Sequence, residues 1–145
     1  MARVLLLEGA VDATLLERAL QRVHRGVPIL QATIATRSWG PELIGLPPQP
    51  PPTLRQVARI DDATWEQVAV DEVHERFAEG TTLWRATLVS APDDRRSELV
   101  VAFHHSICDG TSATWLMQWT LAAYRALSTG RDTEEVLPSA AGDLH

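Results

Sequence analysis

The sequence predicts an α/β protein, a two-layer α+β sandwich in which a mixed, largely antiparallel sheet packs against helices on one face. Three observations support this fold class. The chain opens with a strand, an amphipathic helix and a second strand. Its second half contains two apolar strands joined by a short polar turn, and a long helix follows the second of them directly. Strands and amphipathic helices in this order predict that the helices pack against a sheet.

The first segments repeat apolar residues at the spacings of a strand and a helix. Residues 3–8 are a short apolar run typical of a strand. Residues 12–25 carry apolar side chains at helical spacing, with Asp12 as the expected N-cap, and Pro28 helps to stop the helix. Residues 30–36 alternate and are rich in β-forming residues, which predicts a second strand.

The middle of the chain is rich in proline. Residues 39–52 hold six of the nine prolines, so we expect an extended surface connection there, polyproline-like near its end. A weaker strand is expected over residues 54–60. Asp61 or Asp62 then caps a helix that continues to about residue 79. The expected apolar face of this helix consists of Trp65, Val68, Ala69, Val73 and Phe77.

The second half contains a hairpin and a long helix. Residues 82–90 and 98–103 read as strands, and the polar turn at 92–96 predicts that they pair antiparallel. Residues 111–128 form a strong helix, whereas residues 131–145 are polar and are expected to be a tail or linker. Strict alternation predicts one face with Leu99, Val101 and Phe103, and another with Val100, Ala102 and His104.

Length, charge and cysteine content exclude several classes of protein. The chain has 145 residues, the size of one domain. A net charge of −6 argues against nucleic-acid binding, and the absence of lysine removes Schiff-base and P-loop chemistry. The single cysteine excludes an internal disulfide and a CxxC zinc site. The apolar run near the start is too short for a signal peptide or a membrane span, which predicts a cytoplasmic location.

The segment HHSICDG, residues 104–110, combines groups that suit chemistry at the exit of an apolar strand. Histidine changes its charge near neutral pH and therefore suits a general base. Asp109 is placed either to cap the following helix or to pair with an arginine, Arg85 and Arg125 being the candidates. Gly110 would permit a tight turn with positive φ.

Two other chemistries for this segment are weaker alternatives. Adjacent residues after a strand point to opposite faces, so His104 and His105 do not suit a shared metal ion, and no known metal spacing is present. Cys108 near His105 suggests a thiol nucleophile, but small buried cysteines are more common than reactive ones.

HHSICDG matches the HHxxxDG motif of the superfamily that contains chloramphenicol acetyltransferase, carnitine acyltransferases, nonribosomal-peptide condensation domains, wax ester synthases and polyketide-associated acyltransferases. Residues 5–34 resemble the opening strand, helix and strand of that family, and residues 77–89 resemble its "F-D-x-x-x-x-P-L-x-R-x-x-L" segment. Most of residues 3–130 therefore line up in order. The resemblance implies one lobe of a chloramphenicol acetyltransferase-like fold, with residues 1–130 as the N-terminal lobe and 131–145 as a tail or inter-lobe linker.

The resemblance also implies roles for individual residues. The general base of the family falls on His105, which would deprotonate a hydroxyl or amine as it attacks an acyl thioester of CoA or of a carrier-protein phosphopantetheine. His104 would be a supporting residue, and Asp109 would be structural through an ion pair with an arginine. Gly110 would leave room beside the substrate channel, and Arg85 would be structural.

Some family features are absent from this sequence. Thr82 replaces the proline of the strand segment and Ala78 replaces its aspartate, while the second-lobe DFGWG-type motif is missing. Members of the condensation and wax-ester branches have two lobes, so we expect a complementary C-terminal lobe or self-association. An acyl or peptidyl carrier protein is a further expected partner, and no metal or tightly bound cofactor is expected. The alternative function is that of a non-catalytic lobe that binds a carrier protein or a second lobe.

Overall fold

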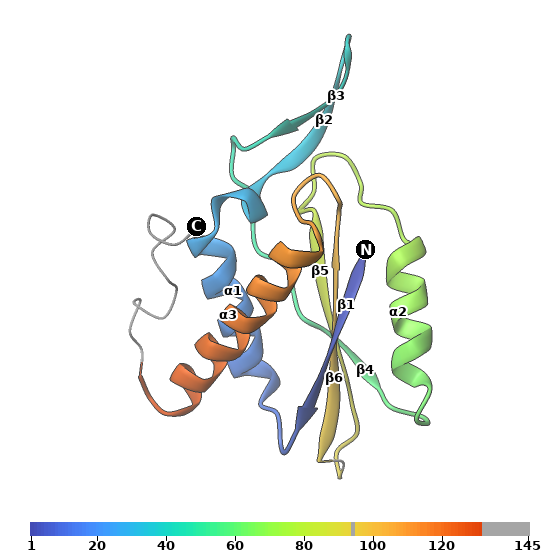
Figure 1. Ribbon diagram of the computed structural model, residues 1–145, viewed down its shortest axis with the longest axis vertical. Coiled ribbons are helices and arrows are strands. Elements are labelled where there is room, and N and C mark those ends of the chain that lie inside the picture. The colour runs from blue at the N-terminus through green and yellow to red at the C-terminus, as the bar shows by residue number, and fades with distance from the viewer. Residues whose placement is uncertain (94, 132–145) are drawn as a thin grey trace.

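The computed structural model describes residues 1–93 and 95–131 and is built around a four-stranded sheet (Figure 1). The strands lie in the order β1-β6-β5-β4. Strand β6 pairs antiparallel with both β1 and β5, whereas β4 pairs parallel with β5. The predicted mixed, largely antiparallel sheet is therefore confirmed. The bounds of the strands are Ala2–Glu8 for β1, Arg55–Ala58 for β4, Trp84–Ser90 for β5 and Arg96–Phe103 for β6.

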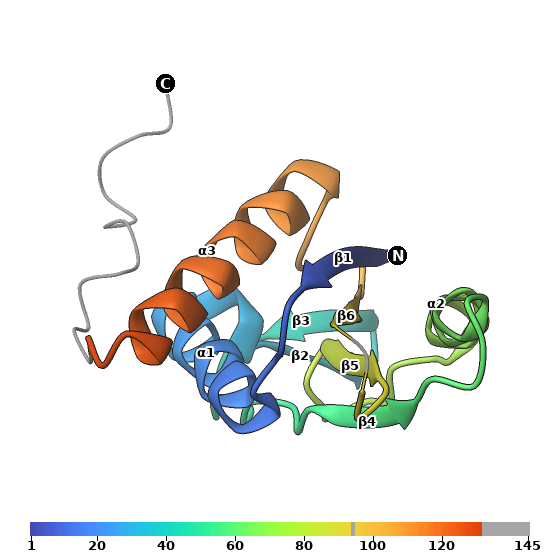
Figure 2. The ribbon, with the colours of Figure 1, turned by 90° about the horizontal axis from the view of Figure 1, so that it is seen from below.

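Helices cover both faces of this sheet. Helices α1 (Ala13–Gly26) and α3 (Gly110–Ser128) pack together on one face, and α2 (Thr64–His74) lies on the other (Figure 2). The sequence predicts helices on one face only, which holds for α1 and α3. The opposite face is covered as well because the β6 residues Val100 and Ala102 are also apolar and need burial.

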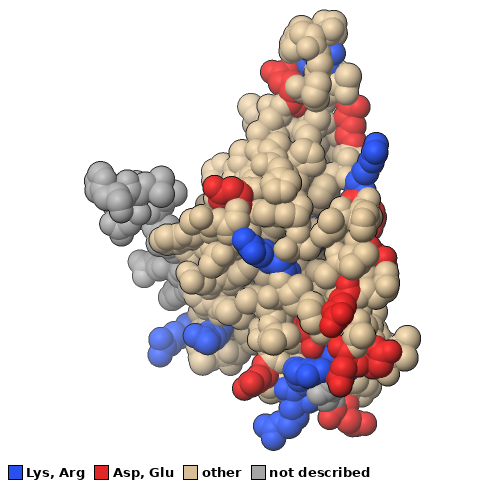
Figure 3. Space-filling view, turned by 45° about the vertical axis from the view of Figure 1, so that its right-hand side comes forward, with Lys and Arg blue, Asp and Glu red and all other residues tan. Residues whose placement is uncertain are grey.

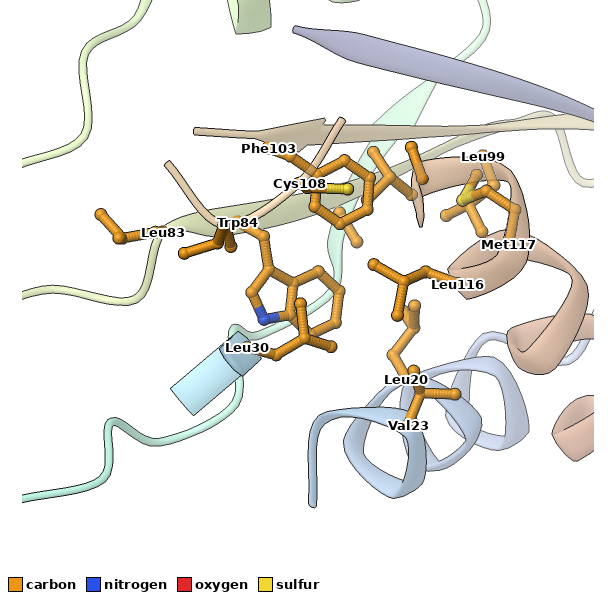
Figure 4. Close-up of a cluster of buried hydrophobic side chains, with 14 of the residues drawn as sticks. Leu20, Val23, Leu30, Leu83, Trp84, Leu99, Phe103, Cys108, Leu116 and Met117 are labelled. Atoms are coloured by element: carbon orange, nitrogen blue, oxygen red, sulfur yellow. The ribbon is translucent and has the colours of Figure 1, made fainter. Parts of the chain in front are cut away.

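The main core lies between the sheet and the α1–α3 pair. Both faces of β6 are buried, and Leu99, Val101 and Phe103 belong to the main core, as the alternation predicts. Figure 4 shows side chains of α1 and α3 meeting those of the sheet. Those labelled are Leu20 and Val23 of α1, Leu116 and Met117 of α3, and Trp84, Leu99 and Phe103 of the sheet.

A two-stranded hairpin projects from the body of the protein (Figure 1). Strand β2 (Thr33–Arg37) begins later than predicted because the residues before it form the 3₁₀ helix η1 (Pro28–Gln31). Strand β3 (Gly40–Ile44) was not predicted, since the sequence indicates only an extended surface connection over residues 39–52. Pro41 is tolerated in β3 because the hairpin has no further strand to require its missing N–H.

Helix α2 is shorter than the sequence predicts, because it ends at His74 instead of continuing to residue 79. Arg85 on β5 donates from Nη2 to the carbonyl oxygens of Glu72 at 3.1 Å and Glu75 at 2.9 Å. These contacts satisfy carbonyl groups at the end of the helix without another helical turn. A contact between separate elements therefore ends α2, which local sequence patterns do not reveal.

The start and the buried face of α2 also differ from the prediction. The N-cap is Ala63 and not an aspartate, although Asp61 supports the turn by accepting the Ala63 N–H at 3.0 Å. Val73 is 55% exposed, whereas Glu72 is 4% exposed. An acid thus occupies the buried face because it has partners there.

No helix among residues 1–93 and 95–131 is both long and apolar enough to cross a membrane. The predicted tail at 131–145 lies outside the described residues except for Arg131.

Candidate active site

The HHSICDG residues form a turn between β6 and α3, at the end of the sheet from which the hairpin projects (Figure 1). The His104 N–H donates to the carbonyl of Leu83 at 2.8 Å, which ties the start of the turn to the residue before β5. The Ile107 N–H donates back to the His104 carbonyl at 3.2 Å. Ile107 and Cys108 are buried, so the second half of the turn is anchored in the core.

The two histidines of this turn differ in their surroundings. His104 is half-buried, and its Nδ1 accepts the Ser106 N–H at 3.1 Å and lies 2.8 Å from Ser106 Oγ. An acceptor at Nδ1 places the proton of the neutral ring on Nε2. His105 is exposed, and its side chain makes no hydrogen bond or ion pair with the residues that the structure describes. Its imidazole is therefore available to a ligand.

Asp109 caps α3. Its Oδ1 accepts the Ser112 N–H at 2.7 Å, and this bond lowers the pKa of the Asp109 carboxyl below its ordinary value. Of the two roles that the sequence left open, the structure shows the cap. Neither candidate arginine pairs with Asp109, because Arg85 pairs with Glu72 and Arg125 lies in the last turn of α3.

Gly110 is the first residue of α3 and does not have a positive φ, which corrects the sequence expectation. The turn needs no left-handed residue because the extended Asp109 leads directly into the helix. Instead, Arg3 lies against Gly110, donating from Nη2 to its carbonyl at 3.2 Å. A Cβ at position 110 would approach that nitrogen to 2.7 Å, so the glycine leaves room for the Arg3 guanidinium.

The structure does not support a thiol nucleophile at Cys108. Its side chain is 3% exposed, and burial raises the pKa of the thiol to about 11. The group is therefore protonated near neutral pH, whereas the attacking species in cysteine chemistry is the thiolate. Across residues 1–93 and 95–131, no three His, Cys, Asp or Glu side chains are grouped to hold a metal ion.

A buried ion pair lies beside the turn, on the α2 face of the sheet. Glu72 of α2 accepts from Arg85 Nε at 2.7 Å, from Arg55 Nη1 at 3.1 Å and from Thr87 Oγ1 at 2.9 Å. The Arg85 guanidinium carbon lies 4.1 Å from the centre of the Phe77 ring. Arg85 therefore joins α2 to β5, and among the described residues it makes no hydrogen bond or ion pair with the HHSICDG motif.

Sequence reasoning included Arg85 but missed Glu72 as its partner. One signal was present: Arg85 stands between two apolar residues of a strand, and a half-buried arginine there needs an acid nearby. The sequence offers several acids within reach, so only the fold selects Glu72.

Phe77 connects this ion pair to the histidine turn. Its ring meets the His104 ring edge-on, with centroids 6.0 Å apart. Phe77 also lines a hollow of about 480 Å³ that is bordered by Arg85 and Trp84 and by the proline-rich segment. Neither His104 nor His105 lines this hollow.

Large apolar side chains remain exposed on several elements. Figure 3 shows one face of the molecule, where many charged side chains gather along one edge and at the end opposite the hairpin, and fewer interrupt the tan middle of the face. Among the residues that the structure describes, the exposed large apolar ones are Leu6, Ile29, Trp39, Leu43, Leu46, Ile60, Val70, Val73 and Trp115.

The family model of the condensation domain matches residues 1–138. No curated protein sequence matches the chain. Among solved structures, the first condensation domain of the calcium-dependent antibiotic synthetase, in complex with a substrate analogue, has a TM-score of 0.79 and 24% identity. The match covers 98% of this chain and 34% of that chain.

Two further structures share the fold. The starter condensation domain of the rhizomide synthetase RzmA, a mutant in complex with C8-CoA, has a TM-score of 0.78 and 18% identity over 89% of this chain and 30% of that one. The X-domain from teicoplanin biosynthesis, in complex with OxyB, has a TM-score of 0.74 and 22% identity over 90% and 28%. The chain thus spans about a third of the length of these structures.

Proposed function

Because this chain belongs to the condensation domain family, we propose that it is the N-terminal lobe of an enzyme that transfers an acyl group from a thioester to a hydroxyl or amine. In this proposal, residues 1–130 form the lobe and 131–145 form the tail or inter-lobe linker. The observation that carries the proposal is the histidine turn. It is fixed on both sides by the core and by the α3 cap, and it presents the exposed His105 imidazole, which has no hydrogen-bond partner among the residues that the structure describes.

In the proposed reaction His105 acts as the general base. It removes the proton of the attacking hydroxyl or amine as that group forms a bond to the thioester carbonyl carbon. The carbon–sulfur bond then breaks, and the leaving thiolate takes up the proton. A thioester is already activated, so the reaction requires no covalent enzyme intermediate.

The donor is an acyl-CoA or an acyl group on a carrier-protein phosphopantetheine. A CoA donor is supported by the relative from the rhizomide synthetase, whose structure holds C8-CoA. The chemistry at His105 is the same for both donors, because both present the acyl group as a thioester of the same pantetheine arm.

The other site residues support the base in this proposal. His104 holds the start of the turn through its hydrogen bond with Ser106, and Asp109 caps α3. Gly110 leaves room beside the channel, where Arg3 lies in this structure.

The test pairs the chain with a separately supplied C-terminal lobe of the same family. With acyl-CoA and an acceptor amine, we expect His105→Gln to lower turnover by about 10²- to 10⁴-fold, the usual contribution of a general base. His74→Gln, at an exposed histidine of α2, is the control and should leave turnover unchanged. Full turnover by the His105→Gln pair would contradict the proposal.

A second candidate function is that of a non-catalytic binding lobe. It is favoured by the relative from teicoplanin biosynthesis, an X-domain whose structure is a complex with another protein, OxyB. On this alternative, the paired lobes bind a carrier protein with an affinity that His105→Gln does not change, and they do not turn over any thioester.

A further inference from the structure

The direction of the His105 side chain is set by the backbone of its turn. Within the described residues, no hydrogen bond or ion pair holds the His105 imidazole. An exposed side chain of this kind takes its position from the residues that fix the main chain on either side. On the α3 side, the anchors are the buried Ile107 and Cys108. On the β6 side, the anchor is His104.

Three of the contacts that His104 makes are of different kinds and bear on its position. Its N–H bonds to the Leu83 carbonyl, its Nδ1 accepts the Ser106 N–H, and its ring meets the edge of Phe77. The first two contacts restrain the main chain and one nitrogen of the ring. The third comes from a residue beyond the end of α2 and restrains the plane of the imidazole.

The position of Phe77 is fixed by the buried ion pair. Arg85 lies over the ring at 4.1 Å, a cation–π distance. Arg85 in turn is held by Glu72, which is 4% exposed and is bound by three donors. Because Arg85 also bonds the carbonyls of Glu72 and Glu75, the end of α2 and the segment that leads to Phe77 are tied to β5.

We propose that Phe77 is a positioning residue for His105, acting through His104 and held in place by the Glu72–Arg85 ion pair. This inference rests on the proposed function of His105 as the base. Phe77 is half-buried, lies on an irregular segment beyond the end of α2 and packs against the edge of the main core. A flat ring is required at this position to meet a guanidinium on its face and an imidazole at its edge.

The test uses three variants of the full chain. Phe77→Leu keeps an apolar side chain but removes the ring, Phe77→Tyr keeps the ring, and Val73→Ala is the control at an exposed residue of the neighbouring helix. The first measurement is amide hydrogen exchange at Ser106, whose N–H bonds to His104 Nδ1. We expect exchange there to be about tenfold faster in Phe77→Leu, because local opening of the turn becomes easier. Phe77→Tyr and Val73→Ala should match the unmodified chain.

The second measurement is acyl transfer by the chain paired with a C-terminal lobe. For Phe77→Leu we expect kcat to fall roughly tenfold to a hundredfold with KM nearly unchanged, because a displaced base weakens the chemical step more than binding. Phe77→Tyr keeps the ring, so its kcat should equal that of the unmodified chain.

The two measurements separate the two proposals. If no paired lobe turns over substrate, the function proposed for His105 fails, but Ser106 exchange still tests whether Phe77 fixes the turn. The positioning role is overturned if Phe77→Leu behaves as Val73→Ala does in exchange. It is also overturned if exchange rises equally at all slowly exchanging amides, since Phe77 would then contribute only to overall stability.

Discussion

The contacts of the buried His24 side chain fix both its position and the nitrogen that carries its proton. It is 1% exposed and stacks on Trp84 with ring centroids 5.9 Å apart. The Trp84 Nε1–H donates to His24 Nδ1 at 3.1 Å, so the proton of the neutral imidazole lies on Nε2 and is donated to the Gln49 carbonyl at 2.8 Å. One histidine thus ties α1 to the sheet and to the proline-rich segment, and only its neutral form satisfies both contacts.

The free energy of unfolding should therefore fall in mild acid. Burial, with a smaller effect from Arg25, lowers the pKa of His24 below its ordinary value of 6.5, although the Gln49 contact opposes this. The unfolded chain then binds the proton more readily, so the contribution of His24 is complete above pH 6.5 and is lost as the pH falls below it. Urea unfolding at a series of pH values from about 5 to 8 measures this dependence.

His24→Gln is the variant for this measurement, because a glutamine can still donate to Gln49 and accept from Trp84 without titrating. We expect a flatter dependence of stability on pH in His24→Gln than in the unmodified chain. His74→Gln, at an exposed position, should keep the original dependence. An unchanged dependence in His24→Gln would show that another group is responsible.

Cys108 provides a second prediction for a single residue. Its thiol has a pKa of about 11 against an ordinary value of 9.0, so the folded chain holds roughly a hundredfold less thiolate at neutral pH. Since Cys108 is the one cysteine of the sequence, a thiol reagent reports on it alone. Labelling should be at least that much slower in the folded chain than in urea, and Cys108→Ala should retain acyl transfer in the paired enzyme. Rapid labelling of the folded chain would instead support the hypothesis that Cys108 is a nucleophile.

Among the elements, α3 depends on its first turn. The Asp109 carboxylate accepts the Ser112 N–H, and the resulting lower pKa means that the charged cap persists in moderately acidic solution and is lost only as the pH falls through that lowered value. We expect the unmodified chain to have the highest melting temperature, Asp109→Asn a lower one and Asp109→Ala the lowest. Asparagine keeps the acceptor of the cap, whereas alanine removes it. Faster amide exchange at Ser112 should accompany the loss. Equal melting temperatures for all three proteins would contradict the capping role.

The elements that sequence patterns predict well are those whose residues satisfy local rules. Strands β5 and β6 follow from alternation around a polar turn, and α3 follows from its apolar spacing and its aspartate cap. The end of α2 and the strand β3 were not predicted. Both depend on contacts between separate segments: the first on Arg85 bonding to helix carbonyls, and the second on pairing with β2 despite Pro41.

The same distinction applies to the candidate site. The sequence places the histidine turn correctly, because HHSICDG is continuous and begins where a buried strand ends, but it left the cap as one of two roles for Asp109. The left-handed conformation expected for Gly110 was wrong, since its small size serves the approach of Arg3 from β1. The contact between Phe77 and His104 was not predicted either, because it requires knowledge of how α2 lies on the sheet.

At the scale of the whole molecule, several large apolar side chains lie outside the core and are exposed. Trp39 is 77% exposed and Leu46 is 81% exposed in and beside the projecting hairpin, and Trp115 is 46% exposed on α3. Trp115 and Trp119 meet edge-on, with ring centroids 6.3 Å apart, which concentrates aromatic surface on one helix. An exposed aromatic pair on one helix is a candidate surface for contact with another protein segment. A two-stranded hairpin also gains little stability from its own contacts.

The last prediction concerns the chain by itself. It spans about a third of the length of its structural relatives, and His105 is exposed just beyond the end of β6. Acyl transfer depends on holding the thioester and the acceptor together at the base, and effective molarity is lost when one side of the site is open to solvent. We therefore expect negligible turnover of acyl-CoA by the purified chain, and a mass in solution above that of the monomer.

Turnover and mass must be measured on the same preparation, because they test different parts of this prediction. A strictly monomeric chain that turns over substrate, and loses that activity in His105→Gln, would refute the argument that the site is incomplete. An inactive monomer would refute only the association. A third result is that the chain is associated and inactive, and gains turnover when a C-terminal lobe displaces its self-contact. The exposed apolar surface and the open site would then both result from the absence of that lobe. The face of this chain that the C-terminal lobe covers is then the same face that copies of the chain cover when that lobe is absent.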